Sequence, residues 1–255
     1  MDAVLKEGKS VYYFPLNALT DSGPYEFVVP KDPDSWTCLP QTRIEGEIML
    51  SKKDATAIAT TDNVGLVNLF PQTLFKQIEI EVNGVQVCDL STPSYPWKCF
   101  IETQLTYSTT AKNTHLLTSL YLKDSETKES NTDGANTGAI NRYKKLKDGK
   151  FFFSIIIHSD FFQSQKLLLP NTEIKLKLIR NEDDFSILAP TAMAGKLKIE
   201  MKSLKISMRR IKIDPTVHLR IEQNLSSTNA YYDITQSKIK HFNIPTGTTS
   251  YDFQS

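Results

Sequence analysis

The sequence predicts an all-β protein built as an antiparallel sandwich. Its 255 residues suffice for one large domain or two small ones. Three observations support this class: apolar and polar residues alternate along most of the chain, an Asn-Gly pair joins two alternating runs, and helical patterns are short and few. Long polar connections separate the runs, and the jelly roll is the antiparallel sandwich that best accepts such insertions. We therefore expect a jelly roll with one or two short helices in its connections.

Five segments carry the strand patterns. In chain order they are residues 43–50, 75–82, 85–88, 151–157 and 173–179. Asn83 and Gly84 tolerate the positive φ angles of a two-residue turn, so they predict a hairpin between the second and third segments. Residues 151–157 are apolar except at Ser154, a composition typical of a strand buried on both faces.

Residues 196–213 fit either a helix or strands. A helix would place Leu197, Met201 and Leu204 on one face, but Ile199 and Ile206 would then stand on the opposite face. Strands direct all of these side chains inward, provided that one extra residue is absorbed near Lys202-Ser203 and another near Arg209-Arg210. We predict strands with two bulges or bends.

Two segments have a helical pattern. Pro96 stands in the first turn of a helix that we expect to run to Thr109 or Lys112. Its expected stripe for packing on the sheet consists of Trp97, Phe100, Ile101, Gln104 and Leu105. Asp214 followed by Pro215 predicts the cap and first residue of a second short helix. Residues 124–141 are almost entirely polar or small, so we expect a mobile surface loop there.

The end of the chain predicts a second domain. A strand pattern restarts at residues 238–244, and another alternation begins at 250–253. Because an unpaired strand is a liability at a domain end, we expect the chain to be part of a longer protein. The expected organisation is a first jelly roll over 1–213, a helix and linker over 214–236, and the start of a second jelly roll over 237–255.

Four segments resemble the double jelly-roll major capsid proteins of Polinton (Maverick) elements and adintovirus-like viruses. The longest are LVNLFPQTLFKQIEIEVNG at 66–84 and YPWKCFIETQLTYS at 95–108. Residues 15–27 look like the opening of the same family, and residues 244–247 look like the start of its second jelly roll. All four segments are structural, so the resemblance identifies a scaffold and no catalytic site.

The resemblance implies a structural subunit of an icosahedral viral or transposon-derived capsid, within the lineage that includes adenovirus hexons. In that family each chain carries two jelly rolls, and three chains form a pseudo-hexagonal capsomer. It implies no enzymatic activity, self-association into trimers, contacts with other capsid proteins, and a place in the virion after assembly inside the host cell. This chain would then hold the first jelly roll and only the beginning of the second.

Two other classes of function remain open from the residues. One is a lectin-like or receptor-like binding module, in which the long loops carry specificity. The other is a cupin-type iron oxygenase, because His158 and Asp160 follow a strand in the His-x-Asp pattern, with His218 or His241 as a distant third ligand. The sequence contains no glycine-rich phosphate loop, no His-Glu-x-x-His motif and no paired cysteines with zinc spacing. We predict no cofactor and no metal.

Charge is balanced overall and concentrated locally. The net charge is +1, so the whole molecule has no field that would recruit nucleic acid or an anionic membrane. The strand region at 196–213 carries a candidate basic patch. It has two possible interpretations: a surface that makes weak contact with packaged DNA, or an ordinary solvated strand face. Its members are Lys198, Lys202, Lys205, Arg209, Arg210 and Lys212. A second basic run follows the polar loop, at Arg142, Lys144, Lys145, Lys147 and Lys150. No apolar run is long enough to span a membrane.

Overall fold

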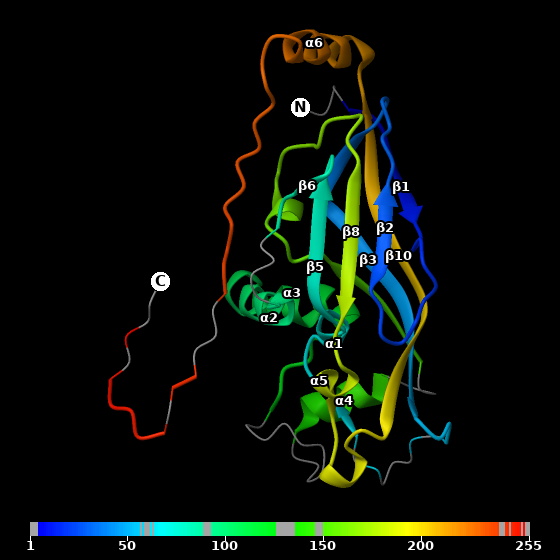
Figure 1. Ribbon diagram of the computed structural model, residues 1–255, viewed down its shortest axis with the longest axis vertical. Helices are drawn as coiled ribbons and strands as arrows, with labels where there is room; N and C mark the ends of the chain where they lie inside the picture. Colours follow the sequence, from blue (N-terminus) through cyan, green and yellow to red (C-terminus); the bar gives the residue numbers. More distant parts are fainter. Residues whose placement is uncertain are drawn as a thin grey trace.

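Two four-stranded antiparallel sheets face each other in the computed structural model (Figure 1). One sheet contains, in spatial order, β1 (Leu5–Tyr13), β10 (Leu197–Ile213), β3 (Trp36–Lys52) and β7 (Lys150–Ile156). The other contains β2 (Tyr25–Val29), β8 (Ile174–Arg180), β5 (Phe75–Val82) and β6 (Val85–Gln86). A small pair is formed by β4 (Gly65–Leu66) and β9 (Ile187–Leu188). The structure describes all residues except 1–4, 57, 59–61, 63, 89–92, 126–135, 146–149, 240–242, 245, 251 and 253–255.

The strand pairing is that of a jelly roll. Among the eight strands of the two large sheets, the first in the chain pairs with the last, β1 with β10, and the second with the seventh, β2 with β8. The third pairs with the sixth, β3 with β7, and the two middle strands β5 and β6 form a hairpin. This is one long antiparallel hairpin rolled into a double sheet, as in a jelly roll. The predicted fold class is confirmed.

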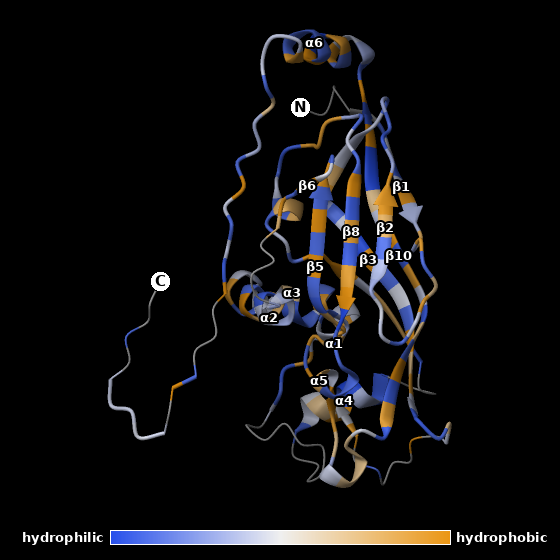
Figure 2. Ribbon diagram, viewed as in Figure 1, coloured by the Kyte–Doolittle hydropathy of each residue, from blue (hydrophilic) through white to orange (hydrophobic). Residues whose placement is uncertain are grey.

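Alternating side chains fill the space between the sheets. Colouring by hydropathy shows polar and apolar residues alternating along β5 and β8 (Figure 2). On β8 the inward residues Ile174, Leu176 and Leu178 are buried, whereas the intervening lysines face outward. The buried aromatic residues Phe27 and Phe75 belong to the same central cluster. Alternation of this kind removes apolar area from water on one face of each sheet, which is the main force that holds the sandwich together.

The strand interpretation of residues 196–213 is confirmed. The segment forms β10, a strand of 17 residues that pairs with β1 on one side and β3 on the other. Its register against β3 shifts between Met201 and Ser203, where the first extra residue was predicted, and this shift keeps the apolar residues on the inner face. The prediction of a second extra residue near Arg209-Arg210 is wrong: at the shift between Ser207 and Arg209 the extra residues lie on β3, between Cys38 and Arg43. The buried residues of β10 include Leu197, Ile199, Met201, Leu204, Ile206 and Met208.

Most other predicted strands are present, with different lengths. The predicted segment 75–82 coincides with β5, and positive φ angles of 49° at Asn83 and 80° at Gly84 form the predicted turn. The predicted strand 43–50 is the central part of the longer β3.

The expectation that residues 151–157 are buried on both faces is wrong. They correspond mainly to β7, which lies at a sheet edge and leaves the Phe152 side chain 71% exposed.

Helices close both ends of the sandwich and cover one side. The predicted first helix is split into α2 (Tyr95–Thr106) and α3 (Thr109–Asn113), because the Ser108 hydroxyl caps α3 by accepting a hydrogen bond from the Ala111 amide. The second is α6 (Pro215–Leu225), capped by Asp214 as predicted. Sequence reasoning missed the short α1 (Phe70–Thr73), α5 (Asp183–Ser186) and α4 (Thr137–Lys145), and the 3-10 turns η3 (His115–Ser119), η6 (Phe161–Gln163) and η7 (Thr191–Met193).

After α6 the chain has no regular structure over residues 229–239 and runs down one side of the molecule toward α2 (Figure 1). Of the predicted strand at 238–244, the described residues 238, 239, 243 and 244 are not in a strand, and the rest lie outside the described residues. Within the described part of the chain, no helix is long and apolar enough to cross a membrane.

Candidate functional site

His158 and Asp160 belong to a network of polar side chains between the end of β7 and α2. The His158 side chain is 1% exposed, and its Nδ1 lies 2.7 Å from Glu102 Oε2. Asp160 Oδ1 accepts a hydrogen bond from Lys98 Nζ at 2.7 Å, and Lys98 Nζ also lies 3.7 Å from Glu102. A lysine ammonium therefore stands between the Asp160 and Glu102 carboxylates, and its positive charge opposes the binding of a metal cation by Asp160.

The distant histidine of the oxygenase hypothesis lies elsewhere. His218 is on α6, where its Nδ1 accepts a hydrogen bond from Trp36 Nε1 at 3.3 Å and its Nε2 lies 3.3 Å from Glu222. His241 lies outside the described residues. Among the residues that the structure describes, no three His, Cys, Asp or Glu side chains gather in a group that could hold a metal ion. The structure does not bring His158, Asp160 and His218 together as an iron site requires.

Arg210 is not part of a solvent-exposed basic patch. Its side chain is buried, and its Nη1 donates to Thr37 Oγ1 at 2.7 Å. Its Nη2 donates to Tyr13 Oη at 3.1 Å and to the Pro30 carbonyl at 3.4 Å. Arg210 points inward because the alternation continues unbroken from Leu204 through Met208, and the extra residues at the register shift before Arg209 lie on β3.

Three of the four lysines of the patch are paired on the outer face of the sheet. Lys198 and Lys202 both contact the Glu200 carboxylate, and these contacts lower the pKa of Glu200. Lys205 Nζ lies 3.2 Å from Glu45 and 4.1 Å from the centre of the Tyr12 ring. Acidic partners thus offset much of the local positive charge. The predicted patch is therefore smaller than the sequence suggests. Of its six residues, only Arg209 and Lys212 are neither buried nor in one of these ion pairs.

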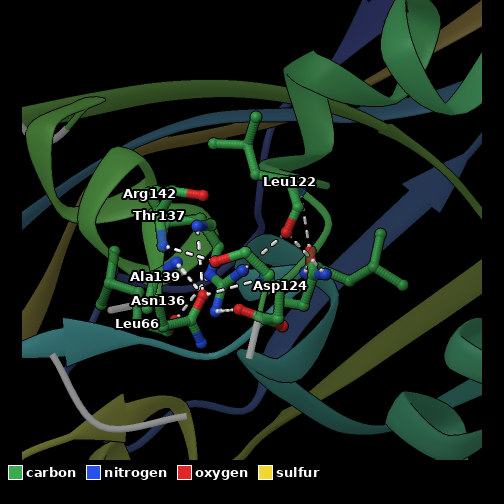
Figure 3. Close-up of polar contacts among 11 residues, drawn as sticks. Leu66, Leu122, Asp124, Asn136, Thr137, Ala139 and Arg142 are labelled. Atoms are coloured by element: carbon green, nitrogen blue, oxygen red, sulfur yellow. Dashed lines mark hydrogen bonds and ion pairs between the residues drawn. The ribbon is translucent and has the colours of Figure 1, made fainter. Parts of the chain in front are cut away.

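Arg142, the first residue of the second basic run, is a structural residue (Figure 3). It is 1% exposed, and its guanidinium reaches three acceptors beneath α4. Nε donates to the Leu66 carbonyl at 2.8 Å, Nη1 to the Leu122 carbonyl at 2.7 Å, and Nη2 to Asp124 Oδ1 at 2.8 Å. The arginine thus ties α4, β4 and the segment before the polar loop together. Because a buried guanidinium needs every one of these partners, this position is not available to an external anion.

The predicted loop at 124–141 is structured at its C-terminal end. Asn136 is buried, and its side-chain oxygen accepts hydrogen bonds from the Gly138 and Ala139 amides at the start of α4, at 3.1 and 3.3 Å. Ala139 is buried as well. The expectation of a mobile surface loop is wrong for residues 136–141, which cap and begin α4, and residues 126–135 lie outside the described residues.

The apolar stripe predicted for α2 faces outward. The exposed fractions of its members are 47% for Trp97, 44% for Phe100, 44% for Ile101 and 80% for Leu105. The buried side of the helix consists of Tyr95, Pro96, Cys99 and Thr103. The Trp97 ring meets the Phe185 ring edge-on, with 6.3 Å between the ring centres. We refer to Trp97, Phe100, Ile101 and Leu105 as the α2 stripe; these large apolar side chains are partly or largely exposed to solvent in a single chain.

Asp183 is committed to internal contacts. Arg180 Nη2 donates to its Oδ1 at 2.8 Å, and the Ile199 amide donates to its Oδ2 at 3.0 Å. Burial raises the pKa of Asp183, and these two partners only partly oppose the shift. This carboxylate therefore holds the end of β8 against β10.

Solved structures with the same fold are viral capsid proteins. The chain matches a protein in the Sputnik virophage structure with a TM-score of 0.57 and 10% identity, over 83% of this chain and 49% of that one. It matches the Faustovirus major capsid protein with a TM-score of 0.52 and 10% identity, over 86% of this chain and 56% of that one. This chain has the jelly-roll fold of viral capsid proteins. The chain spans about half the length of these jelly-roll relatives. No protein-family model and no curated protein matches the sequence.

Proposed function

We propose that this chain is the first jelly roll of a viral or transposon-derived major capsid protein. The observation that carries the proposal is the rolled-hairpin strand pairing, supported by the fold match to the Faustovirus major capsid protein. The matches cover about half of the neighbouring chains. A second jelly roll that begins near residue 237 is part of the proposal. On this proposal the protein acts by forming a shell and carries out no catalysis.

The resemblance to Polinton and adintovirus-like capsid proteins is part of the proposal. Its longest segment, 66–84, covers α1, β5 and the β5–β6 turn, and segment 95–108 covers α2. These are the elements where the helical side layer meets a sheet, so the resembling residues serve packing and turn formation. The proposal therefore includes pseudo-hexagonal trimers, contacts with other capsid proteins, and a location in the virion after assembly inside the host cell.

The surface of the described residues is suited to contacts between copies. The α2 stripe presents large apolar and aromatic side chains, the kind that is enriched where protein surfaces bind each other. The outer faces of the sheets carry paired charges, such as Lys177 with Glu79 at 3.7 Å. DNA contact is a weaker part of the proposal, because glutamates pair with three of the predicted lysines.

Replacing Phe100 and Leu105 together by serine should weaken self-association about tenfold or more, because the exchange removes two large apolar side chains from the proposed contact. Sedimentation velocity on the product of the complete reading frame that contains this chain measures the effect. Leu219→Ser is the matched control, because Leu219 is 57% exposed on α6, outside the stripe. A lectin-like or receptor-like module would instead sediment as a monomer with either substitution. Unchanged association in the double variant would contradict the role of the α2 stripe.

A further inference from the structure

The segment that follows α6 is held to the sandwich at two separate points. At the first point, the Tyr232 hydroxyl donates to the Leu167 carbonyl at 3.1 Å and accepts from the Leu169 amide at 3.0 Å. The Tyr232 ring and the Ile234 side chain also pack against the main core. Burial raises the pKa of Tyr232. Apolar packing and hydrogen bonds together make this contact a firm anchor.

The second point is Asp160, at the end of the same segment. Its Oδ2 accepts a hydrogen bond from the Ser237 amide at 2.8 Å, and its Oδ1 accepts one from the Ser237 hydroxyl at 3.3 Å. Both donors are neutral groups of an otherwise exposed residue. This contact consists of hydrogen bonds to one carboxylate.

The Asp160 carboxylate does not depend on the segment for charge balance. Lys98 Nζ lies 2.7 Å from it, and the two side chains are 14% and 15% exposed. Breaking the bonds from Ser237 leaves this ion pair in place, so no unpaired charge is created. The docking position on the sandwich is therefore already formed when the segment is absent.

The space beneath the second contact is not filled by packing. A cavity of about 80 Å³ lies there, lined by residues of the sandwich, including His158, and by Ser237 and Ile239 of the segment. The Nε2 atom of His158 is buried and has no hydrogen-bond partner among the described residues. The end of the segment at Ser237 therefore borders a partly polar cavity, whereas the contact at Tyr232 is closely packed.

We propose that residues 231–237 are a strap with a fixed anchor at Tyr232 and a releasable latch at Asp160. When the latch is closed, the chain after Ser237 leaves the sandwich in one fixed direction next to α2. When the latch opens, the strap stays attached at Tyr232, and the following chain is free to change direction. The inference rests on contacts inside one chain, so it stands or falls independently of capsid assembly.

Amide hydrogen exchange followed by mass spectrometry tests the strap. In Asp160→Asn, which cannot accept all the bonds that the carboxylate accepts, the Ser237 amide should exchange about tenfold faster, while the Leu169 amide, which donates to the Tyr232 hydroxyl, stays within twofold of the parent protein. In Tyr232→Phe, both amides should exchange faster. Asp233→Asn is the matched control: Asp233 is 90% exposed and pairs only at the surface with Lys166, so its exchange pattern should match that of the parent.

A second variant keeps the test decisive if Asp160→Asn fails to fold. Ser237→Pro removes the amide donor in an exposed, irregular segment and leaves the Asp160–Lys98 pair intact. Trypsin should then cleave after the exposed Lys238 about tenfold faster than in the parent protein. Unchanged exchange of the Ser237 amide in Asp160→Asn, together with unchanged cleavage in Ser237→Pro, would overturn the latch. Equal acceleration of the Ser237 and Leu169 amides in Asp160→Asn would overturn the separation of latch and anchor.

Discussion

Replacing Arg142 by alanine lowers the free energy of unfolding by about 3–5 kcal/mol, because it removes a fully paired guanidinium from a buried site. The Leu66 and Leu122 carbonyls lose the hydrogen bonds that Arg142 donates to them, and Asp124 loses its ion pair. A cavity the size of the side chain also opens beneath α4. Urea unfolding followed by circular dichroism measures the change.

The matched control for Arg142 is Lys144→Ala on the same helix. Lys144 is exposed and belongs to the same basic run, so its removal should change stability by about 0.5 kcal/mol or less. Comparing the stability changes of the two variants distinguishes a buried structural arginine from an exposed lysine on the same helix. Equal effects of the two substitutions would show that Arg142 does not hold α4 against β4.

Replacing Phe27 by alanine should also cost about 3–5 kcal/mol, because the ring is 1% exposed and lies on the inner face of β2. Val28, the next residue, points to the opposite face and is only half-buried. Val28→Ala should therefore cost about 1 kcal/mol or less. Thermal unfolding of both variants tests the orientation of the strand. A larger effect at Val28 than at Phe27 would mean that the register of β2 in the sandwich is wrong.

The sandwich was predictable because its signal is local and repeated. Alternation places each strand, and the Asn83-Gly84 pair joins β5 to β6 without information from the rest of the chain. The periodicity of residues 196–213 favoured strands because only an extended chain brings Leu197 and Ile199 to one face. Which strands pair with which is a long-range property, and it became visible only in the structure.

The surface and the buried polar contacts were less predictable, because they depend on distant partners. The apolar pattern of α2 fits either a buried or an exposed stripe, and the contact of its opposite side, with Cys99 and Thr103, decides the orientation. Arg142 looks like any solvated cation in a basic run, since its acceptors are 18 to 76 residues away in the chain. The available sequence signal for the start of α4 was the asparagine at position 136, because asparagine favours the position that caps a helix.

Electron microscopy of the product of the complete reading frame that contains this chain tests the central proposal most directly. A capsid subunit with two jelly rolls should appear as threefold particles of hexagonal outline, or as closed shells and hexagonal arrays at higher concentration. Uniform particles with the mass of a single copy at every concentration would contradict the proposal.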